Sequence, residues 1–440
     1  MGKNKKRIST GLRLIDKIYI GILLVIFGGI VVHAPLSVGF STLLPHDTLL
    51  IKSWKEMLIL IAATILVAIL YRKKQFGLLK NPILILIGGY TLLHILLSFY
   101  SLHLGVTVTS IAAGLAIDLR YVIYFGLVYI CLSLYPDQRK NFLKVFMFGA
   151  VLVLVFALLQ VFILPADILK YIGYGPHTIE PYLTVDKNNA FVRINSTLRG
   201  PNPLGAYAVI VLGFITAAIA KRKIPPMRQS KIIAAVLVVG SIVALWVSYS
   251  RSALIAGIAA VVIVFSMSLF KKVYTKIWVI VGIVLVVLLS GYFVTHQNSS
   301  FVSNVFLHEN PNGGSPVTSN DGHVSSLQQG FARIVQQPLG AGIGSSGSAS
   351  LLGDSPLIIE NSYLFVAHET GWLGLGLFIA IFLMILVGLW KARQGYVALG
   401  VFASGIGLAG IALLLPIWAD DTIGIIWWGL AAVALTGAKK

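Results

Sequence analysis

Residues 54–74, WKEMLILIAATILVAILYRKK, contain the pattern that decides the fold of this chain. The run is mostly apolar as far as Tyr71 and ends in three consecutive basic residues, Arg72, Lys73 and Lys74. About 20 mostly apolar residues are enough for a helix to cross the hydrocarbon core of a bilayer. The segment therefore predicts a transmembrane helix with one end held at the membrane surface by positive charge.

The same pattern recurs along all 440 residues, of which 57% are hydrophobic and only 11% are charged. Mean hydropathy is +0.90. A soluble domain carries roughly a quarter charged residues, so this chain has too little polar surface to cover a water-facing globule, and the bilayer is its main solvent. We predict an all-α integral membrane protein, a single polytopic domain over residues 1–440, with about twelve transmembrane helices. They are expected near residues 16–34, 54–71, 82–100, 108–134, 145–164, 202–220, 232–249, 252–270, 277–295, 362–390, 396–416 and 422–437.

Basic residues mark every second boundary between these helices, as at Arg139-Lys140 and Lys439-Lys440. Together with the basic N-terminus they place 25 of the 34 Lys and Arg residues on one face. The positive-inside rule makes that face the cytoplasm. Twelve spans return the C-terminus to it, so we predict a multi-pass protein of the cytoplasmic (inner) membrane with both termini cytoplasmic. The first apolar stretch lacks a clear signal-peptide cleavage site and is expected to remain as a helix.

The net charge of +19 does not indicate a nucleic-acid partner, because the basic residues form short clusters between apolar runs and no long basic stripe. The single cysteine, Cys131, lies within an apolar run. One cysteine excludes an internal disulfide framework, and we expect Cys131 to pack between helices.

Two segments on the predicted outer face are too long to be simple turns, residues 165–201 and 296–361. Loops longer than about 15 residues are usually functional or disordered. The second begins with a polar stretch, residues 310–315, that could be a mobile lid, and becomes amphipathic over 324–335, a candidate interfacial helix. Its apolar positions at helical spacing are Leu327, Phe331, Ile334 and Val335. The chain has no internal repeat, which weakens the case for an inverted-repeat transporter.

Arginines are scarce on the outer face, so those present are informative. Arg193 and Arg199 lie in the stretch RINSTLRGPNPLG, directly before a predicted helix, and Arg251 lies in SYSRS between two others. Asn202 as a helix cap would leave backbone N–H groups at that helix start for an anion. A guanidinium fork matches phosphate oxygens and does not deprotonate, so three converging arginines would suit a diphosphate. The alternative is that each arginine extends to lipid headgroups.

The stretch from Pro338 to Ser346 reads PLGAGIGSS. It does not follow a strand of a βαβ unit, so it predicts a tight turn over the membrane surface rather than a nucleotide cradle. Glu360 stands where the loop meets the next helix, and partial desolvation there would suit a general base. It could instead complement the helix dipole. His368 and Glu369 lie deeper, where ionisable residues are functional candidates or pair with another helix.

Other ionisable residues carry plainer expectations. Asp118 and Arg120, inside a predicted helix, are expected to serve packing or a local ion pair. The acidic doublet Asp420-Asp421 could bind a cation, although a solvated helix junction is the preferred interpretation. The loop histidines lack partners at ligand spacing, so no metal site is expected. They are His308 and His323.

Three motifs together make the chain resemble the O-antigen ligase and polymerase superfamily. Residues 193–205 are similar to the family's arginine followed by Thr-x-x-x-Pro-Asn-x-x-Gly, and residues 250–252 to its Ser-Arg motif opening a helix. Residues 338–374 are similar to Pro-x-x-Gly-x-Gly, His-Asn-x-x-Leu and Glu-x-Gly-x-x-Gly. With the twelve-helix plan and the large outer loop, the resemblance covers most of the chain. Glu360 stands where the family commonly has the histidine before Asn-x-x-Leu.

The resemblance implies glycosyl transfer at the outer face of the cytoplasmic membrane, in polysaccharide or lipopolysaccharide biosynthesis for the cell envelope. An undecaprenyl-diphosphate-linked glycan would be the donor, and a hydroxyl of a glycan, lipid or protein the acceptor. Arg193, Arg199 and Arg251 would bind the diphosphate without a metal or cofactor. Glu360 would replace the family's histidine as general base. Supporting residues would be Asn202, Asn361, Tyr363 and Glu369.

Two other functions fit the same residues. One is a polymerase of the same superfamily, which joins glycan to glycan. The other is a transporter or flippase that binds an anionic solute or lipid through these arginines. A transporter predicts broken helices and ionisable residues near mid-membrane, and Asp118, Arg120 and Glu369 give it some support.

The charge pattern predicts that the 296–361 loop is outside the cell. A cysteine in place of Ser315 should therefore react with a membrane-impermeant thiol reagent in intact cells, and the unchanged protein, with Cys131 alone, should not. Labelling of the Ser315→Cys variant only after permeabilisation would overturn the predicted orientation.

Overall fold

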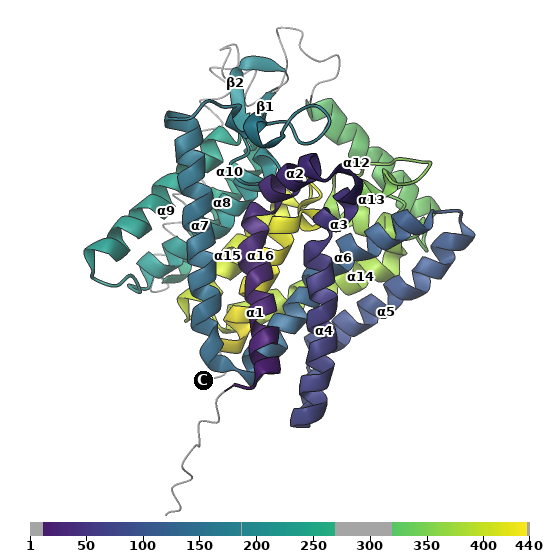
Figure 1. Ribbon diagram of the computed structural model, residues 1–440, viewed down its shortest axis with the longest axis horizontal. Coiled ribbons are helices and arrows are strands. Elements are labelled where there is room, and N and C mark those ends of the chain that lie inside the picture. The colour runs from purple at the N-terminus through teal and green to yellow at the C-terminus, as the bar shows by residue number, and fades with distance from the viewer. Residues whose placement is uncertain (1–11, 186, 269–318, 438–440) are drawn as a thin grey trace, which may run out of the picture.

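A computed structural model describes residues 12–185, 187–268 and 319–437. This part of the chain is almost entirely helical. Figure 1 shows the long helices running between two ends of the molecule: α1 begins and the C-terminus lies at one end, and strands β1 and β2 lie at the other. We call these ends the terminal face and the hairpin face.

Nine helical segments of the described residues are long and apolar enough to cross a membrane. They are Leu14–Leu43 (α1, Leu14–Gly29, with η1, Ile30–Val32, and α2, His33–Leu43), Trp54–Lys73 (α4), Pro82–His103 (α5), Val108–Leu134 (α6), Pro136–Phe162 (η4, Pro136–Gln138, with α7, Arg139–Phe162), Pro201–Ala220 (α8), Arg228–Val247 (α9), Arg251–Ser268 (α10) and Ser362–Lys391 (α14). Two shorter apolar helices follow, Tyr396–Ile411 (α15) and Asp421–Thr436 (α16). The remaining short elements are η2 (Pro45–Asp47), α3 (Thr48–Lys52), η3 (Phe76–Lys80), η5 (Ile168–Ile172), α12 (Ser319–Gln336), α13 (Gly347–Ser350) and η7 (Ile417–Ala419).

Every predicted span except one corresponds to one of these apolar helices. The exception, residues 277–295, lies outside the described residues, as do residues 310–315. The predicted start of α7 was wrong by six residues. Two lysines interrupt the apolar run there, but they lie on the exposed side of the helix while Phe142 is fully buried.

The segment 165–201 is more than the loop that the sequence predicted. It contains the short helix η5 and an antiparallel pair of strands, Tyr182–Val185 (β1) and Asn188–Ile194 (β2). Val192 and Ile194 are β-branched residues that favour a strand, and Arg193 lies opposite Leu183 in the ladder. The all-α prediction therefore missed a small sheet that carries one of the candidate arginines.

The amphipathic stretch 324–335 is helical, as predicted, within the longer helix α12. Ile334 is buried, and Gly330 lies against the side chain of Leu364 at the start of α14. Phe331 and Val335 are exposed, at 59% and 55%. One side of α12 thus packs on the bundle and the other leaves two large apolar side chains uncovered.

Helix α8 lies at the centre of the bundle, with nearly all of its residues buried. It packs against α9, α10 and α15. A Cβ on Gly400 of α15 would lie 2.7 Å from the Cα of Phe214 on α8, and one on Gly213 would lie 2.9 Å from the carbonyl oxygen of Gly400. Glycines allow helix backbones in a membrane to approach this closely.

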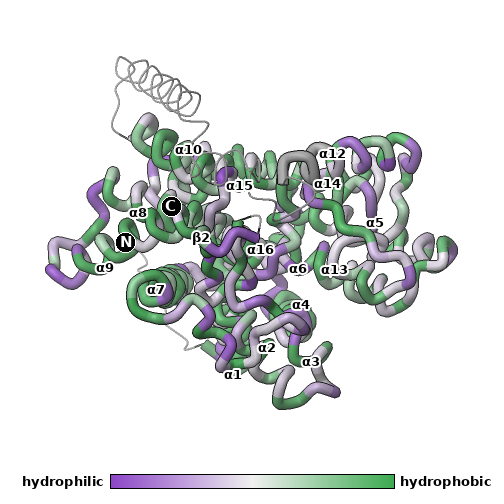
Figure 2. Tube along the Cα trace, turned by 90° about the horizontal axis from the view of Figure 1, so that it is seen from above, coloured by the Kyte–Doolittle hydropathy of each residue, from purple (hydrophilic) through white to green (hydrophobic). Residues whose placement is uncertain are grey.

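Ionic and aromatic contacts hold the other helices. Arg72, from the segment that decides the fold, pairs with Asp16 and joins α4 to α1 at the terminal face. Trp427 and Trp428 of α16 contact Phe382 of α14. Figure 2 shows hydrophilic positions in the middle of the hairpin face, around β2 and the start of α16, while α7 and α10 further out are mostly hydrophobic.

The close contact between α8 and α15 predicts a difference between two glycines of α15. Gly400→Ala should destabilise the protein by about 1–3 kcal/mol, because the added methyl group meets backbone atoms that cannot move aside. Gly410→Ala, with nothing within 4 Å of its Cβ position, should be neutral or slightly stabilising. Thermal unfolding in detergent measures both, and an equal loss in the two variants would contradict the proposed packing.

Candidate active site

Arg193 joins three segments at the hairpin face. Its Nε donates to the carbonyl oxygen of Ser248 at 2.8 Å, and its terminal nitrogen donates to Oδ1 of Asn202 at 2.6 Å. The first contact reaches the turn between α9 and α10, and the second reaches the first turn of α8. The two arginine-containing motifs are therefore parts of one structural unit.

The chain between Arg193 and α8 is hydrogen-bonded to α7. The backbone N–H of Ser196 donates to the Gln160 side chain at 3.0 Å, and its hydroxyl donates to the carbonyl oxygen of Val153 at 2.7 Å. Ser196 is fully buried and has a φ of +52°. Buried polar contacts of this kind fix a chain that would otherwise be mobile.

The cap of helix α8 lies two residues earlier than the prediction that made Asn202 the cap. Gly200 occupies the cap position and Pro201 begins the helix. Proline suits this position because its φ is already helical and it has no N–H to satisfy. Asn202 therefore lies inside the first turn, where its side chain serves as the acceptor for Arg193. The prediction that Asn202 caps the helix was wrong.

The turn before Arg251 is tight and closely packed. Tyr249 has a φ of +46°, a left-handed conformation that is uncommon for a large side chain. The hydroxyl of Ser248 accepts from the N–H of Ser250 at 3.2 Å. A Cβ on Gly205 would lie 2.9 Å from that same hydroxyl oxygen, so the last glycine of the first motif lets α8 approach the turn. Arg251 is the first residue of α10 and is half-buried.

Arg199 is exposed at the hairpin face, just before α8. Its charge acts on Asp420, at the start of α16. Burial and the neighbouring Asp421 raise the pKa of Asp420 above its usual value, while Arg199 and Arg120 act in the opposite direction. The start of α16 thus lies within electrostatic reach of the first arginine motif.

Glu360 directly precedes the cap of α14, as predicted, and is half-buried. Asn361 caps the helix by accepting from the N–H groups of Tyr363 and Leu364. Its amide donates to the carbonyl oxygen of Leu413 at 2.7 Å. The next two residues also bond to the last turn of α15 and to the chain that follows it. The contacts are Ser362 N–H to Ala412, Ser362 Oγ to Leu415 and Tyr363 OH to Ala409.

The glycine stretch forms tight turns, as predicted, and encloses a carboxylate of the protein itself. Gly340, Gly342 and Gly344 have φ of +85°, +96° and +80°. Both oxygens of Glu369 accept hydrogen bonds from this stretch, from the N–H of Gly344 at 2.9 Å and from the N–H and hydroxyl of Ser346 at 3.0 Å each. We call residues 338–347 the glycine loop.

Helix α14 is broken at Gly371, whose φ is 65° and ψ is −169°. The break leaves backbone groups without partners in the helix, and the glycine loop supplies them. Ala341 N–H donates to the carbonyl oxygen of His368 at 2.6 Å, and Trp372 N–H donates to that of Pro338 at 3.1 Å. Broken helices were expected of a transporter. In this chain, the glycine loop supplies hydrogen-bond partners for the backbone groups that the break leaves without helical partners.

Arg120 forms the ion pair that was expected of it, within a buried network. Its guanidinium pairs with Asp421 and, at 3.2 Å, with Glu56. Lys55 lies 3.5 Å from the same aspartate, and His33 Nε2 lies 3.0 Å from it. Asp420 caps α16 at the predicted junction. The interpretation of the doublet as solvated was wrong for Asp421, which pairs with Arg120 and Lys55. No sequence pattern predicts this network, since its members come from four separate segments.

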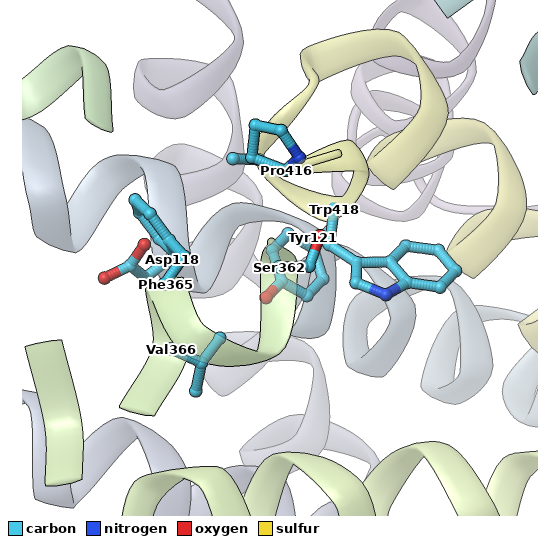
Figure 3. Close-up of a pocket in the computed structure, with 8 residues that line it drawn as sticks. Asp118, Tyr121, Ser362, Phe365, Val366, Pro416 and Trp418 are labelled. Atoms are coloured by element: carbon cyan, nitrogen blue, oxygen red, sulfur yellow. The ribbon is translucent and has the colours of Figure 1, made fainter. Parts of the chain in front are cut away.

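A small cavity lies beside the start of α14 (Figure 3). Its volume is about 10 Å³, roughly the space of one water molecule, so it is not a site for a sugar or a diphosphate. It is lined by Asp118, Tyr121, Ser362, Phe365, Val366, Pro416, Trp418 and Ala419.

Hydrogen bonds place two of the candidate helix starts at the hairpin face, because Arg193 of β2 bonds to Asn202 in α8 and to Ser248 just before α10. Helices α8 and α10 begin there, next to Arg199 and at Arg251, and α15, which packs on both, ends there. The chain after α15 holds Asn361 and Ser362. Tyr363 bonds to α15 and Glu369 bonds to the glycine loop, so both make structural contacts. Of the loop histidines, His308 lies outside the described residues and His323 belongs to α12.

These observations define a multi-pass membrane protein with its arginine motifs joined at one end of the helix bundle. Residues 234–379 match the family model described as O-antigen ligase. This part of the chain is similar to the O-antigen ligase domain of a family of membrane enzymes of glycan transfer, and the match implies lipid-linked glycan substrates. The match includes Arg251 and Glu360, whereas Arg193 and Arg199 precede it. No curated protein sequence matches the chain.

Proposed function

We propose that this enzyme transfers a glycan from an undecaprenyl-diphosphate carrier to an acceptor hydroxyl, with the chemistry at the hairpin face. The observation that carries the proposal is the double hydrogen bond of Arg193, which joins β2, the start of α8 and the turn before Arg251. This contact gathers the first two family motifs into one cationic region. Glu360 directly precedes α14. The first residues of α14 are hydrogen-bonded to the chain that follows α15.

The orientation follows from the charge distribution. Among the described residues, the basic end of α4 and the basic start of α7 lie at the terminal face, where Arg72 pairs with Asp16 and Arg139 bonds to Val433. The positive-inside rule assigns this face to the cytoplasm. The hairpin face is then the outer face of the cytoplasmic membrane. The polyprenyl tail of the donor would approach between helices, and its diphosphate would lie at the level where α8 and α10 begin.

The reaction needs charge stabilisation on one side of the anomeric carbon and a base on the other. The acceptor oxygen attacks that carbon, the bond from the carbon to the diphosphate oxygen breaks, and the acceptor proton passes to Glu360. Negative charge accumulates on the departing diphosphate. Arg193, Arg199 and Arg251 would stabilise it through preorganised, bidentate hydrogen bonds.

Ligase and polymerase chemistry differ only in the molecule that carries the acceptor hydroxyl. We infer a ligase-like reaction, because the matching family model is described as O-antigen ligase. The contacts within the bundle do not favour the transporter alternative. Arg120 pairs with Asp421 and Glu56, and Glu369 binds the glycine loop, so these deep ionisable groups act as internal links.

The arginines should not tolerate lysine, which has no planar fork. We expect Arg193→Lys and Arg251→Lys each to lower the turnover of lipid-linked donor by about 10²-fold or more, at equal protein level in vesicles. Arg393→Lys is the matched control, because Arg393 stacks on Trp390 at the far end of α14. Wild-type turnover in both test variants would show that these arginines only contact lipid or support the structure.

Arg193 also has an architectural contact, which Asn202→Ala can separate from charge binding. That variant removes one partner of Arg193 and keeps the guanidinium. If Arg193 binds the donor, Arg193→Lys should lose far more turnover than Asn202→Ala at a similar unfolding temperature.

Replacing Glu360 tests the proposed general base, because the family commonly has histidine at this position. General-base assistance contributes typically 10²- to 10⁴-fold in rate, so Glu360→Gln should bind donor normally and lose about that much turnover. Glu360→His should keep some activity, with a pH dependence moved towards that of imidazole, whose pKa is about 6.5. Glu180→Gln removes an exposed carboxylate before β1 and should have no effect.

The rival bases are histidines, and the same assay tests them. His308, His323 and His368 can each be replaced by Gln. An inactive histidine variant beside a fully active Glu360→Gln would place the base elsewhere.

A further inference from the structure

Tyr249 has a backbone conformation that a tyrosine rarely adopts. It follows the last turn of α9, where its N–H donates to the carbonyl oxygen of Trp246 at 3.1 Å, and its φ is +46°. Glycine is the usual residue at this left-handed position after a helix. The other described residues with a positive φ, glycines aside, carry no aromatic ring. A large ring in a strained conformation is typical of a residue whose side chain has a function.

The ring of Tyr249 lies against the strand that carries Arg193. Its centroid is 6.1 Å from that of Phe191, with 72° between the ring planes. Phe191 comes two residues before Arg193 in β2, and residues two apart in a strand lie on the same face. This face therefore makes two neighbouring contacts with the turn before α10. One is the contact of the two rings, and the other is the bond from Arg193 to the carbonyl oxygen of Ser248.

Two of the arginines proposed to bind the diphosphate lie on either side of this tyrosine. Arg193 bonds to Ser248, directly before Tyr249, and Arg251 begins α10 two residues after it. The turn between them is fixed, since the hydroxyl of Ser248 accepts from the N–H of Ser250 at 3.2 Å. Tyr249 is half-buried, so part of its surface remains exposed beside the two guanidinium groups.

The first sugar of a lipid-linked donor lies next to the diphosphate, because its anomeric carbon is bonded to a diphosphate oxygen. A side chain between two arginines that hold the diphosphate is therefore close to this sugar. A pyranose ring has a face of C–H groups that packs well on the face of an aromatic ring. Aromatic side chains with an apolar body and a polar tip commonly line the sites of small ligands.

We propose that Tyr249 is a sugar-binding residue, whose ring packs on the first sugar of the donor while Arg193 and Arg251 hold the diphosphate. This inference rests on the proposed function, because it takes the arginines as the diphosphate site. Phe191 supports the ring from the hairpin. A ring that only held β2 against the turn would be a packing residue, and the two roles predict different results.

Two lipids separate these roles. Lipid-linked glycan extracted from the membranes of the native host carries the sugar, and undecaprenyl diphosphate has the same diphosphate and tail without it. Transfer from the first gives a donor KM, and competition by the second gives an inhibition constant. With purified protein in vesicles, Tyr249→Leu should raise the donor KM about tenfold or more. The inhibition constant of undecaprenyl diphosphate should stay unchanged.

The comparison needs variants that keep the ring, remove it differently or remove the diphosphate contact. Tyr249→Phe keeps the ring and should retain the wild-type donor KM. Arg193→Lys should raise both constants, because the two lipids share the diphosphate. Tyr171→Leu is the control at an exposed tyrosine of η5 and should change neither constant. If Tyr249→Leu does not fold, Tyr249→Asn gives the same comparison, because asparagine tolerates a left-handed backbone.

An equal rise in both constants for Tyr249→Leu would make Tyr249 a packing residue that holds Arg193 in place, and would overturn the proposal. An unchanged donor KM would do the same. Failure of the proposed function gives a different result: undecaprenyl diphosphate would not inhibit the wild-type enzyme, or Arg193→Lys and Arg251→Lys would leave both constants unchanged. Either result would also remove the basis for a sugar site at Tyr249.

Discussion

Inside a bilayer, a polar group cannot form hydrogen bonds with water, so its hydrogen-bond partner must lie within the protein. Glu369 shows how far this constraint shapes the structure. The break of α14 at Gly371 leaves backbone groups without helical partners, and a buried carboxylate lies two residues away. The glycine loop supplies partners for both, because its N–H groups bind the carboxylate and its first residues, Pro338 and Ala341, bond to the broken helix. Two apparently separate sequence motifs are thus one folded unit.

The sequence was sufficient for the parts of the fold that depend on hydrophobicity alone. Long apolar runs and basic boundaries place helices such as α6, predicted and found at 108–134. The β1–β2 hairpin was missed, since two short strands in a polar loop leave no periodic apolar signal. The first span was predicted to end near residue 34, but it turns at η1 and continues as α2. The first residue of α2 is a buried histidine, His33, that contacts Asp421, nearly 400 residues away.

The candidate site divides in the same way. Residue type and spacing identified Arg193, Arg251 and Glu360 as the positions to examine, because guanidinium and carboxyl groups have few uses at a membrane surface. The spacing of residues did not predict which neighbouring residues make structural contacts. Asn202 was expected to cap α8 and instead accepts from Arg193. Asp421 was expected in solvent and instead balances Arg120 and Lys55. Such roles depend on contacts between distant segments, which a single sequence does not display.

Helix α15 connects the two halves of the proposed chemistry. Its glycines bring it against α8 and α10, with a Cβ on Gly407 only 3.0 Å from the carbonyl oxygen of Ala256, and these helices begin beside the arginine motifs. The chain leaving α15 accepts the hydrogen bonds of Asn361 and Ser362, directly after Glu360. In the proposed chemistry, helix packing would therefore contribute to the position of the Glu360 carboxylate relative to a bound diphosphate. A base on such a support can change from histidine to glutamate without a change in the surrounding frame, because the frame is built from the residues on either side of it.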